Sequence, residues 1–159
     1  MTVLPPSQGE GQGSSGEACW PPLDLFNRVN FRMWMKEEAV GMELTNEQIS
    51  EAFSHHDFEA AYPYLADDVR WNLVGQRRVE GKERVIAVCR ESAAYLTGVV
   101  TNFVKFRTVV TDDCIVIDSV AEYTGKEEKP SYVASCDIYD FMNGKVSEIT
   151  SYTVEVEAP

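Results

Sequence analysis

The sequence predicts an α+β fold in which three helices come before a sheet of long strands. Apolar residues recur at helical spacing between residues 45 and 97, and apolar and polar residues then alternate from residue 99 to residue 156. Helices and strands separated in this way are typical of α+β proteins. A chain of 159 residues is long enough for a single domain with a sizeable core.

The first 44 residues differ in composition from the rest of the chain. Residues 1–22 are rich in Gly, Pro and Ser, and they cannot bury enough apolar surface to offset the entropy lost on ordering. Residues 23–44 carry a weak helical repeat, which predicts either a docking helix or a dispensable segment that ends near Met42. We therefore expect a disordered or loosely attached extension over residues 1–44, and a pocket domain over residues 45–159.

Three helices are expected at the start of this domain. Residues 45–48 read Thr-Asn-Glu-Gln, a capping box in which two side chains satisfy two free backbone N–H groups. Asp57 can begin a second short helix, and Pro63 should end or kink it because proline lacks an N–H donor. The third helix is predicted over residues 82–97, with Gly98 in the left-handed conformation that ends many helices.

Strands follow the second and third helices. A first strand is expected over residues 69–74, and residues 77–80 can form its hairpin partner. Asn143-Gly144 is the strongest turn signal, because both residues tolerate the positive φ of a two-residue hairpin. The alternating pattern predicts four long strands, over residues 99–110, 114–123, 131–142 and 146–156.

Both faces of the predicted sheet need a cover. Side chains alternate between the faces of a strand, and in residues 131–142 both alternating sets are mostly apolar. The three helices can cover one face. A second copy of the chain is the simplest cover for the other, so we expect a homodimer.

The helix-facing side of the sheet has room for a ligand. Ser119 and Ala121 place small side chains in the middle of one row, and a curved sheet with small central residues leaves an apolar hollow. Asp137 is the one carboxylate in the middle of this predicted lining. The predicted ligand-binding residues are Phe53, Trp71, Leu73, Cys89, Ile117, Ser119, Ala121, Tyr139 and Ile149.

Each prominent side chain of the hollow has two interpretations. Burial would raise the pKa of Asp137 and make it useful as an acid or base near neutral pH. Alternatively, Asp137 is a buried residue that bonds to Ser135, Tyr139 or the backbone. Trp71 and Tyr139 can stack on a ring of the ligand, or they can simply belong to the core.

Charge and composition exclude several classes of partner. The formal net charge is -12, and a surface this acidic repels phosphate backbones and anionic lipids. No apolar run approaches the roughly 20 residues that a membrane helix needs. We expect a small apolar ligand, no nucleic acid, no membrane, and a cytoplasmic location.

Neither the cysteines nor the histidines form a metal motif. The chain has four cysteines without CxxC spacing, so we expect reduced thiols, no metal and no cofactor. His55 and His56 are expected at a helix end, where the imidazoles meet the negative end of the helix dipole and need no catalytic role.

Four segments together carry a family resemblance: LADDVRW, VEGKERV, AEYTG and SCDIYDFMNGKVSEITSY. In this order and spacing they resemble the nuclear transport factor 2-like superfamily, which includes ketosteroid isomerase and SnoaL-type polyketide cyclases. The resemblance covers roughly residues 45–157. It implies a cone-shaped, curved, mixed or antiparallel sheet wrapped around three helices (a cystatin-like α+β barrel), an interior pocket and frequent dimerisation.

The resemblance also bears on the chemistry of the pocket. Ketosteroid isomerases use a basic Asp, a Tyr in the first helix, and a protonated Asp late in the sheet that donates a hydrogen bond to an oxyanion. Alignment of SCDIYDF puts Asp137 at that donor position, whereas the base and tyrosine positions fall on Leu73 and near Ile49. Steroid isomerisation by that mechanism is therefore not supported. SnoaL-type cyclases also use an Asp in the late sheet.

The sequence thus predicts a small-molecule-binding SnoaL-like protein. The favoured activity is that of a cofactor-independent isomerase, cyclase or lyase, with Asp137 moving a proton on a small apolar carbonyl substrate. The alternative is a non-catalytic ligand-binding protein or a dimeric adaptor domain. The fold alone does not choose between them.

Overall fold

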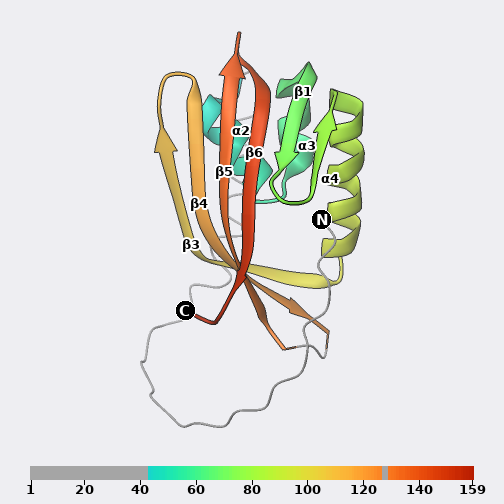
Figure 1. Ribbon diagram of the computed structural model, residues 1–159, viewed down its shortest axis with the longest axis vertical. Coiled ribbons are helices and arrows are strands. Elements are labelled where there is room, and N and C mark those ends of the chain that lie inside the picture. The colour runs from blue at the N-terminus through green and yellow to red at the C-terminus, as the bar shows by residue number, and fades with distance from the viewer. Residues whose placement is uncertain (1–42, 127–128) are drawn as a thin grey trace. The chain divides into compact units, whose positions relative to one another are not determined.

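The computed structural model describes residues 43–126 and 129–159 (Figure 1). Residues 1–42, on which most of the predicted extension falls, lie outside these ranges. The helices are α2 (Asn46–Ser54), α3 (Phe58–Ala61) and α4 (Lys82–Leu96), with the 3-10 helix η1 (Tyr62–Tyr64) between α3 and the first strand. The strands are β1 (Leu65–Leu73), β2 (Arg77–Glu80), β3 (Val99–Val110), β4 (Cys114–Gly125), β5 (Ser131–Met142) and β6 (Lys145–Val156).

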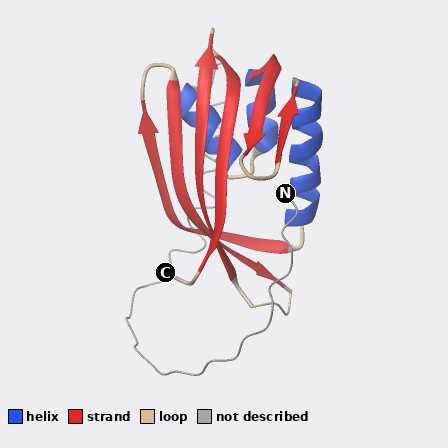
Figure 2. Cartoon of the chain, viewed as in Figure 1, coloured by secondary structure: helices blue, strands red, loops and turns tan. Residues whose placement is uncertain are grey.

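The strands form one mixed sheet in the order β2-β1-β6-β5-β4-β3. Strands β1 and β6 are parallel, and every other neighbouring pair is antiparallel. Figure 2 shows the helices gathered behind and beside the strands, and contacts join α2 to β4 and α4 to β1. The sheet does not close, because β2 and β3 have no partner strand at the two edges within the described residues. The α+β prediction is confirmed.

The first helix begins and packs as predicted. The Thr45 hydroxyl accepts from the backbone N–H of Gln48, and the Gln48 side chain accepts from the N–H of Thr45. Ile49, Ala52 and Phe53 are then buried on one face of α2. The predicted capping box is confirmed.

The second helix is shorter than its apolar pattern indicated. It ends at Ala61, and the next three residues form η1 with Pro63 in its first turn. Leu65 then begins β1, where the prediction placed the first strand residue at Val69. A register shift between β1 and β6 explains the difference, because it lets an irregular stretch with exposed Asp residues remain part of the strand.

The end of the third helix differs from the prediction at one residue. Helix α4 ends at Leu96, where Thr97 follows as the cap. The Thr97 N–H donates to the Ala94 carbonyl, and the Thr97 hydroxyl donates to the Ala93 carbonyl. These bonds satisfy the last turn locally, and Gly98 does not take the predicted left-handed conformation.

The four long strands are present, and each of the three turns between them joins antiparallel neighbours. At the last turn Asn143 and Gly144 both have positive φ, 52° and 72°, as the sequence predicted. Figure 1 shows that β3 changes direction along its length, first crossing from the end of α4 and then running beside β4. A register shift between Phe103 and Lys105 marks a bulge in this strand.

The core lies between the helices and one face of the sheet. Trp71 of β1, Tyr139 of β5 and Ile149 of β6 meet Phe53 and Ile49 of α2 in one apolar cluster. The other face, which we call the outer face, is not covered by described residues. Its exposed apolar side chains include Val100, Val109, Tyr152 and Val154, which are 44–60% exposed.

Three cysteines fall within the described residues, and all are free thiols. Cys89 is buried, whereas Cys114 and Cys136 are half-buried. No helix in the described ranges has the length and apolar character that a membrane crossing requires.

Candidate functional site

Asp137 lies in the middle of β5, with β4 on one side and β6 on the other. Ile117 and Ser151 are its partners across the two ladders. Asp137 shares a strand face with Tyr139, and Ser54 at the end of α2 bonds to both side chains. The carboxyl group is therefore on the helix-facing side of the sheet, as predicted.

Two serines bond to this carboxyl group. The Ser54 Oγ lies 3.4 Å from Asp137 Oδ2 and 2.7 Å from the Tyr139 hydroxyl. Ser151 is a second side-chain hydrogen-bond partner of Asp137. The Ser151 hydroxyl also accepts from Trp71 Nε1 at 2.9 Å. A continuous polar network thus crosses an otherwise apolar part of the fold.

Burial and hydrogen bonds act in opposite directions on the acid of this network. Burial raises the pKa of Asp137, and the hydrogen bonds from Ser151 and Ser54 oppose that effect. Burial, and then the negative charge of Asp137, raise the pKa of Tyr139 and bring that of Tyr123 to about 12. The ion pairs among the described residues all have partly exposed partners, and none includes Asp137.

Asp137 lies where the packed interior meets the half-buried residues Ser135 and Tyr123, which we call the open region. Tyr139, two residues further along the strand, is 1% exposed, and Ile117 on the neighbouring strand is fully buried. On the other side Ser135 and Tyr123 are half-buried, as is Asp137 itself. The Ser135 hydroxyl pairs with that of Ser119 at 2.8 Å.

The turn after α2 adds an aromatic wall to the open region. The imidazole of His55 stacks on Phe106 with ring centroids 3.9 Å apart, and it also contacts Phe103 at 4.9 Å. The ring of His56 lies 6.1 Å from Phe103 and 6.3 Å from Tyr123. These contacts join the end of α2 to strands β3 and β4.

The two histidines lie at the end of α2 as predicted, with His55 as its C-terminal cap, and the absence of a catalytic role stays a prediction. Burial lowers the pKa of His55, although its bond to the Glu51 carbonyl acts in the opposite direction. Burial, followed by the charge of His55, lowers the pKa of His56 to about 4. The neutral imidazoles are therefore favoured, whereas stabilisation by the helix dipole would favour the charged forms.

The sequence did not predict this wall, because the alternation of side chains between the two sheet faces is interrupted in β3. The bulge between Phe103 and Lys105 pairs Phe103 with Ala121 and Phe106 with Ser119. Both phenylalanines consequently face the helices, although strict alternation would put them on opposite faces. No signal in the sequence located the bulge.

The predicted ligand-binding residues come together, but they form the packed interior. Phe53 is at their centre, with edge contacts to Trp71 at 5.2 Å and to Tyr139 at 5.9 Å between ring centroids. Their role as ligand contacts stays a prediction. The residues that are at most 8% exposed include all nine of them: Phe53, Trp71, Leu73, Cys89, Ile117, Ser119, Ala121, Tyr139 and Ile149.

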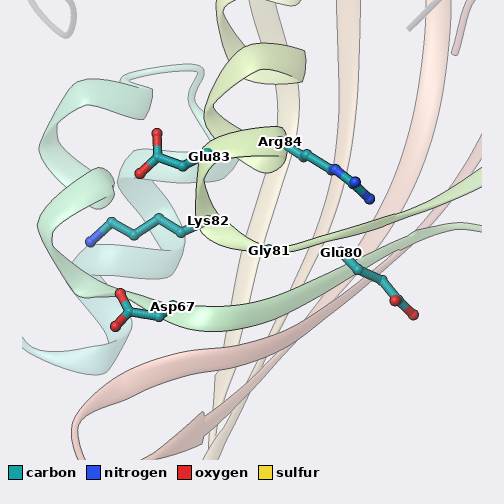
Figure 3. A pocket seen from close by; sticks show the side chains of 6 residues that line it. All are labelled: Asp67, Glu80, Gly81, Lys82, Glu83 and Arg84. Atoms are coloured by element: carbon teal, nitrogen blue, oxygen red, sulfur yellow. The ribbon is translucent and has the colours of Figure 1, made fainter.

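A separate surface hollow of about 300 Å³ lies where β2 leads into α4 (Figure 3). Figure 3 shows Lys82 and Glu83 on the same side as Asp67, while Glu80 and Arg84 point away from them. The hollow is open, carries both signs of charge and shares no residue with the network around Asp137. In the described part of the chain, no group of three His, Cys, Asp or Glu side chains is placed to hold a metal ion.

Comparisons with known proteins agree with this architecture. The model of the family described as SnoaL-like domain matches residues 46–149. An NTF2-like protein of unknown function from Cytophaga hutchinsonii is 35% identical, with a TM-score of 0.63, and the match covers 72% of this chain and 100% of that chain. A comparison with functionally curated proteins gives no match.

Two more distant structures share the fold. The LEH-like epoxide hydrolase of M. tuberculosis is 18% identical with a TM-score of 0.53, over 68% of this chain and 81% of that one. A "putative polyketide cyclase" from Pseudomonas putida is 14% identical with a TM-score of 0.56, over 69% and 92%. The resemblance drawn from the four sequence segments is confirmed. Because the family model spans well over half of the sequence, this chain belongs to the SnoaL-like domain family, with an NTF2-like fold.

Proposed function

We propose that this protein binds a small, mostly apolar carbonyl compound beside Asp137 and moves a proton on it without a cofactor. The observation that carries the proposal is the position of Asp137 on the helix-facing side of the sheet, half-buried beside Ser54, where burial raises its pKa. Carboxyl groups with raised pKa values concentrate at acid-base sites, because their proton affinity then suits reactions near neutral pH. The fold fits the binding of small molecules, and structures with this fold include proteins named as enzymes.

The chemistry follows from the two protonation states of one carboxyl group. As a carboxylate, Asp137 takes a proton from the carbon next to the carbonyl group, which leaves an enolate. As the resulting acid, it returns that proton to a different carbon in an isomerisation, or to a leaving oxygen in an elimination. The Ser54 and Ser151 hydroxyls stabilise the carboxylate during the exchange, because hydrogen bonds to the charged form favour it.

Proton exchange on a simple ketone tests this proposal. The native protein in D₂O should speed the replacement of hydrogen by deuterium next to the carbonyl group of 1-tetralone, as followed by proton NMR. Asp137→Asn preserves the size of the side chain and removes its acid-base function, so the catalysed rate should fall by about 100-fold or more. A matched control is Asp140→Asn, an exposed Asp on the outer face of the same strand. Equal catalysed rates in the native protein and Asp137→Asn would refute the proposal.

A non-catalytic binding protein is the second candidate. The Ser54 hydroxyl is within 2.7 Å of the Tyr139 hydroxyl, so part of the polar network is already satisfied without a ligand. On this account, 1-tetralone raises the melting temperature of the native protein and of Asp137→Asn alike, and no deuterium exchange is catalysed.

We also infer that the outer face is the contact between two copies of the chain. Val109, Tyr152 and Val154 are apolar side chains of this face that a monomer would leave in water. Val154→Lys should shift the sedimentation coefficient from that of a dimer to that of a monomer, while Val110→Lys, at an exposed site on the opposite face, should not. A native protein that sediments as a monomer would exclude the dimer. The cytoplasm stays the predicted location.

A further inference from the structure

The turn that ends α2 brings a second polar side chain to the open region. His56 has a φ of 65°, in the left-handed region that a residue with a side chain adopts at a cost in free energy. Asn or Gly would take this conformation more readily than His does. His is, with Asn and Asp, among the residues that adopt positive φ more often than other residues do, so the turn accommodates His56 and sets the direction of its side chain.

The ring of His56 is held among aromatic neighbours. Ring centroids of Phe58, Phe103 and Tyr123 lie 5.7, 6.1 and 6.3 Å from its own. The three neighbours come from α3, β3 and β4, so the imidazole has a defined place between the helices and the sheet. His56 as a whole is half-buried.

The ring nitrogens keep their hydrogen-bonding capacity. Within residues 43–126 and 129–159, no hydrogen bond joins the His56 imidazole to another side chain or to the backbone. Burial and the neighbouring His55 lower the pKa of His56 to about 4, so the imidazole is neutral at physiological pH. A neutral imidazole has one nitrogen that donates and one that accepts. Neither nitrogen bonds to a described residue.

His56 and Asp137 belong to the same region of the fold. Ser54, two residues before His56, lies 3.4 Å from the Asp137 carboxyl group. Tyr123 contacts the His56 ring, and the charge of Asp137 acts on the Tyr123 hydroxyl. The two polar groups are therefore linked through Tyr123 on one side and through the last turn of α2 on the other, with aromatic rings along the way.

We propose that His56 is a ligand-recognition residue of the Asp137 site, and that the ligand is a flat ring compound with a polar group at each end. The carbonyl group would face Asp137, which rests on the function proposed above. A hydroxyl group at the far side of the ring would bond to the His56 imidazole, while the ring body packs against Phe103 and Tyr123.

Binding of two kinds of ketone tests the inference. The probes are 1-tetralone, which has only the carbonyl group, and its 5-, 6- and 7-hydroxy derivatives, each of which adds one hydroxyl group on the ring. Dissociation constants are measured by calorimetry with the full-length chain. At least one hydroxy derivative should bind about tenfold more tightly than 1-tetralone, as expected for one added hydrogen bond. If no derivative binds more tightly than 1-tetralone, the inference is overturned.

Matched variants identify the residue responsible. His56→Phe keeps an aromatic ring without nitrogens, and it should remove the tenfold preference for a hydroxy derivative over 1-tetralone. His56→Asn suits the left-handed backbone and should also lose the preference, which covers the case where the Phe variant fails to fold. The control is His55→Phe, because the His55 ring stacks on Phe106 and its Nδ1 is bonded to the Glu51 carbonyl at 2.9 Å. This control should retain the preference, and a preference that survives both His56 variants would contradict the inference.

The results separate this inference from the proposed function. If deuterium exchange depends on Asp137 but the hydroxy derivatives show no preference that depends on His56, only the inference about His56 fails. If the preference depends on His56 but exchange is absent or does not depend on Asp137, the ligand class stands and the catalytic proposal fails.

Discussion

Two halves of the same sheet face differ in how they are packed. Around Tyr139, Ile115 and Ile149 the side chains are at most 1% exposed, and α2 presses Phe53 against them. Ser135 and Tyr123, a few residues along the same strands, are only half-buried, although Ser119 and Ala121 beside them on β4 are 2% and 3% exposed. Asp137 lies between the two halves. The comparison teaches that alternation assigns a side chain to a face, whereas the helix above it decides whether that face is filled.

The largest expected effect is at the centre of the packed half. Phe53→Ala removes a ring that contacts Phe58, Trp71 and Tyr139, so it should lower the free energy of unfolding by about 3–5 kcal/mol. Val133→Ala, at the half-buried end of β5, removes less material from a looser site and should cost about 1 kcal/mol or less. Urea denaturation measures both. Equal losses would show that the two halves are packed alike.

The next largest effect is expected at Ser151, which bonds to Trp71 in the core and to Asp137. Ser151→Ala leaves the buried Trp71 indole N–H without its acceptor, which should lower the free energy of unfolding by about 1–3 kcal/mol. It also removes a bond that stabilises the Asp137 carboxylate, so the pKa of Asp137 should rise further. Thr150→Ala, on the opposite face of β6, is the neighbouring control for the denaturation measurement. A Ser151→Ala variant as stable as the native protein would remove Ser151 from the network.

The third prediction is the pH dependence that Asp137 gives to stability. Because the folded protein holds this proton more tightly than the unfolded chain does, the stability from Asp137 is complete below the unfolded pKa of about 3.8. It is lost as the pH rises through the higher folded pKa, by about 1.4 kcal/mol for each unit of difference. Denaturation of the native protein and Asp137→Asn from pH 3 upward measures it. A stability difference between the two that does not change with pH would contradict the raised pKa.

The smallest effect is expected at the open side of Asp137. Ser135→Ala breaks the bond between the Ser135 and Ser119 hydroxyls and leaves the Ser119 hydroxyl, which is 2% exposed, without this partner, so the cost should be about 1 kcal/mol. A loss as large as that of Phe53→Ala would show that this region belongs to the packed core. Urea denaturation of Ser135→Ala and of the native protein measures this loss in the free energy of unfolding.

Much of the fold could be predicted because its signals are local. The capping box at Thr45, the Asn143-Gly144 hairpin and the alternation in the four long strands each depend on a few neighbouring residues. The start of β1 at Leu65 could not be predicted, because it depends on the register with β6. The conformation of Gly98 could not be predicted either, because it depends on the hydrogen bonds of Thr97. Local propensity competes with such tertiary contacts and loses to them here.

The candidate site was predictable only in part for a related reason. Parity put Asp137 on the helix-facing side of the sheet, and the structure places it there beside Ser54 and Ser151. The alternation assigns a side chain to a face but does not show how deeply it is buried, so the nine predicted lining residues include fully buried ones such as Ile117. The wall formed by Phe103, Phe106 and the two histidines depends on a bulge and a left-handed turn, neither of which has a clear sequence signal.

The most direct test of the central claim is an NMR titration of the Asp137 carboxyl carbon, with and without 1-tetralone. The account predicts a pKa above the ordinary value of about 3.8, and a carboxyl resonance that moves when the ketone binds. A carboxyl group that titrates at or below its ordinary value and ignores the ketone would show that Asp137 is a solvated or purely structural residue.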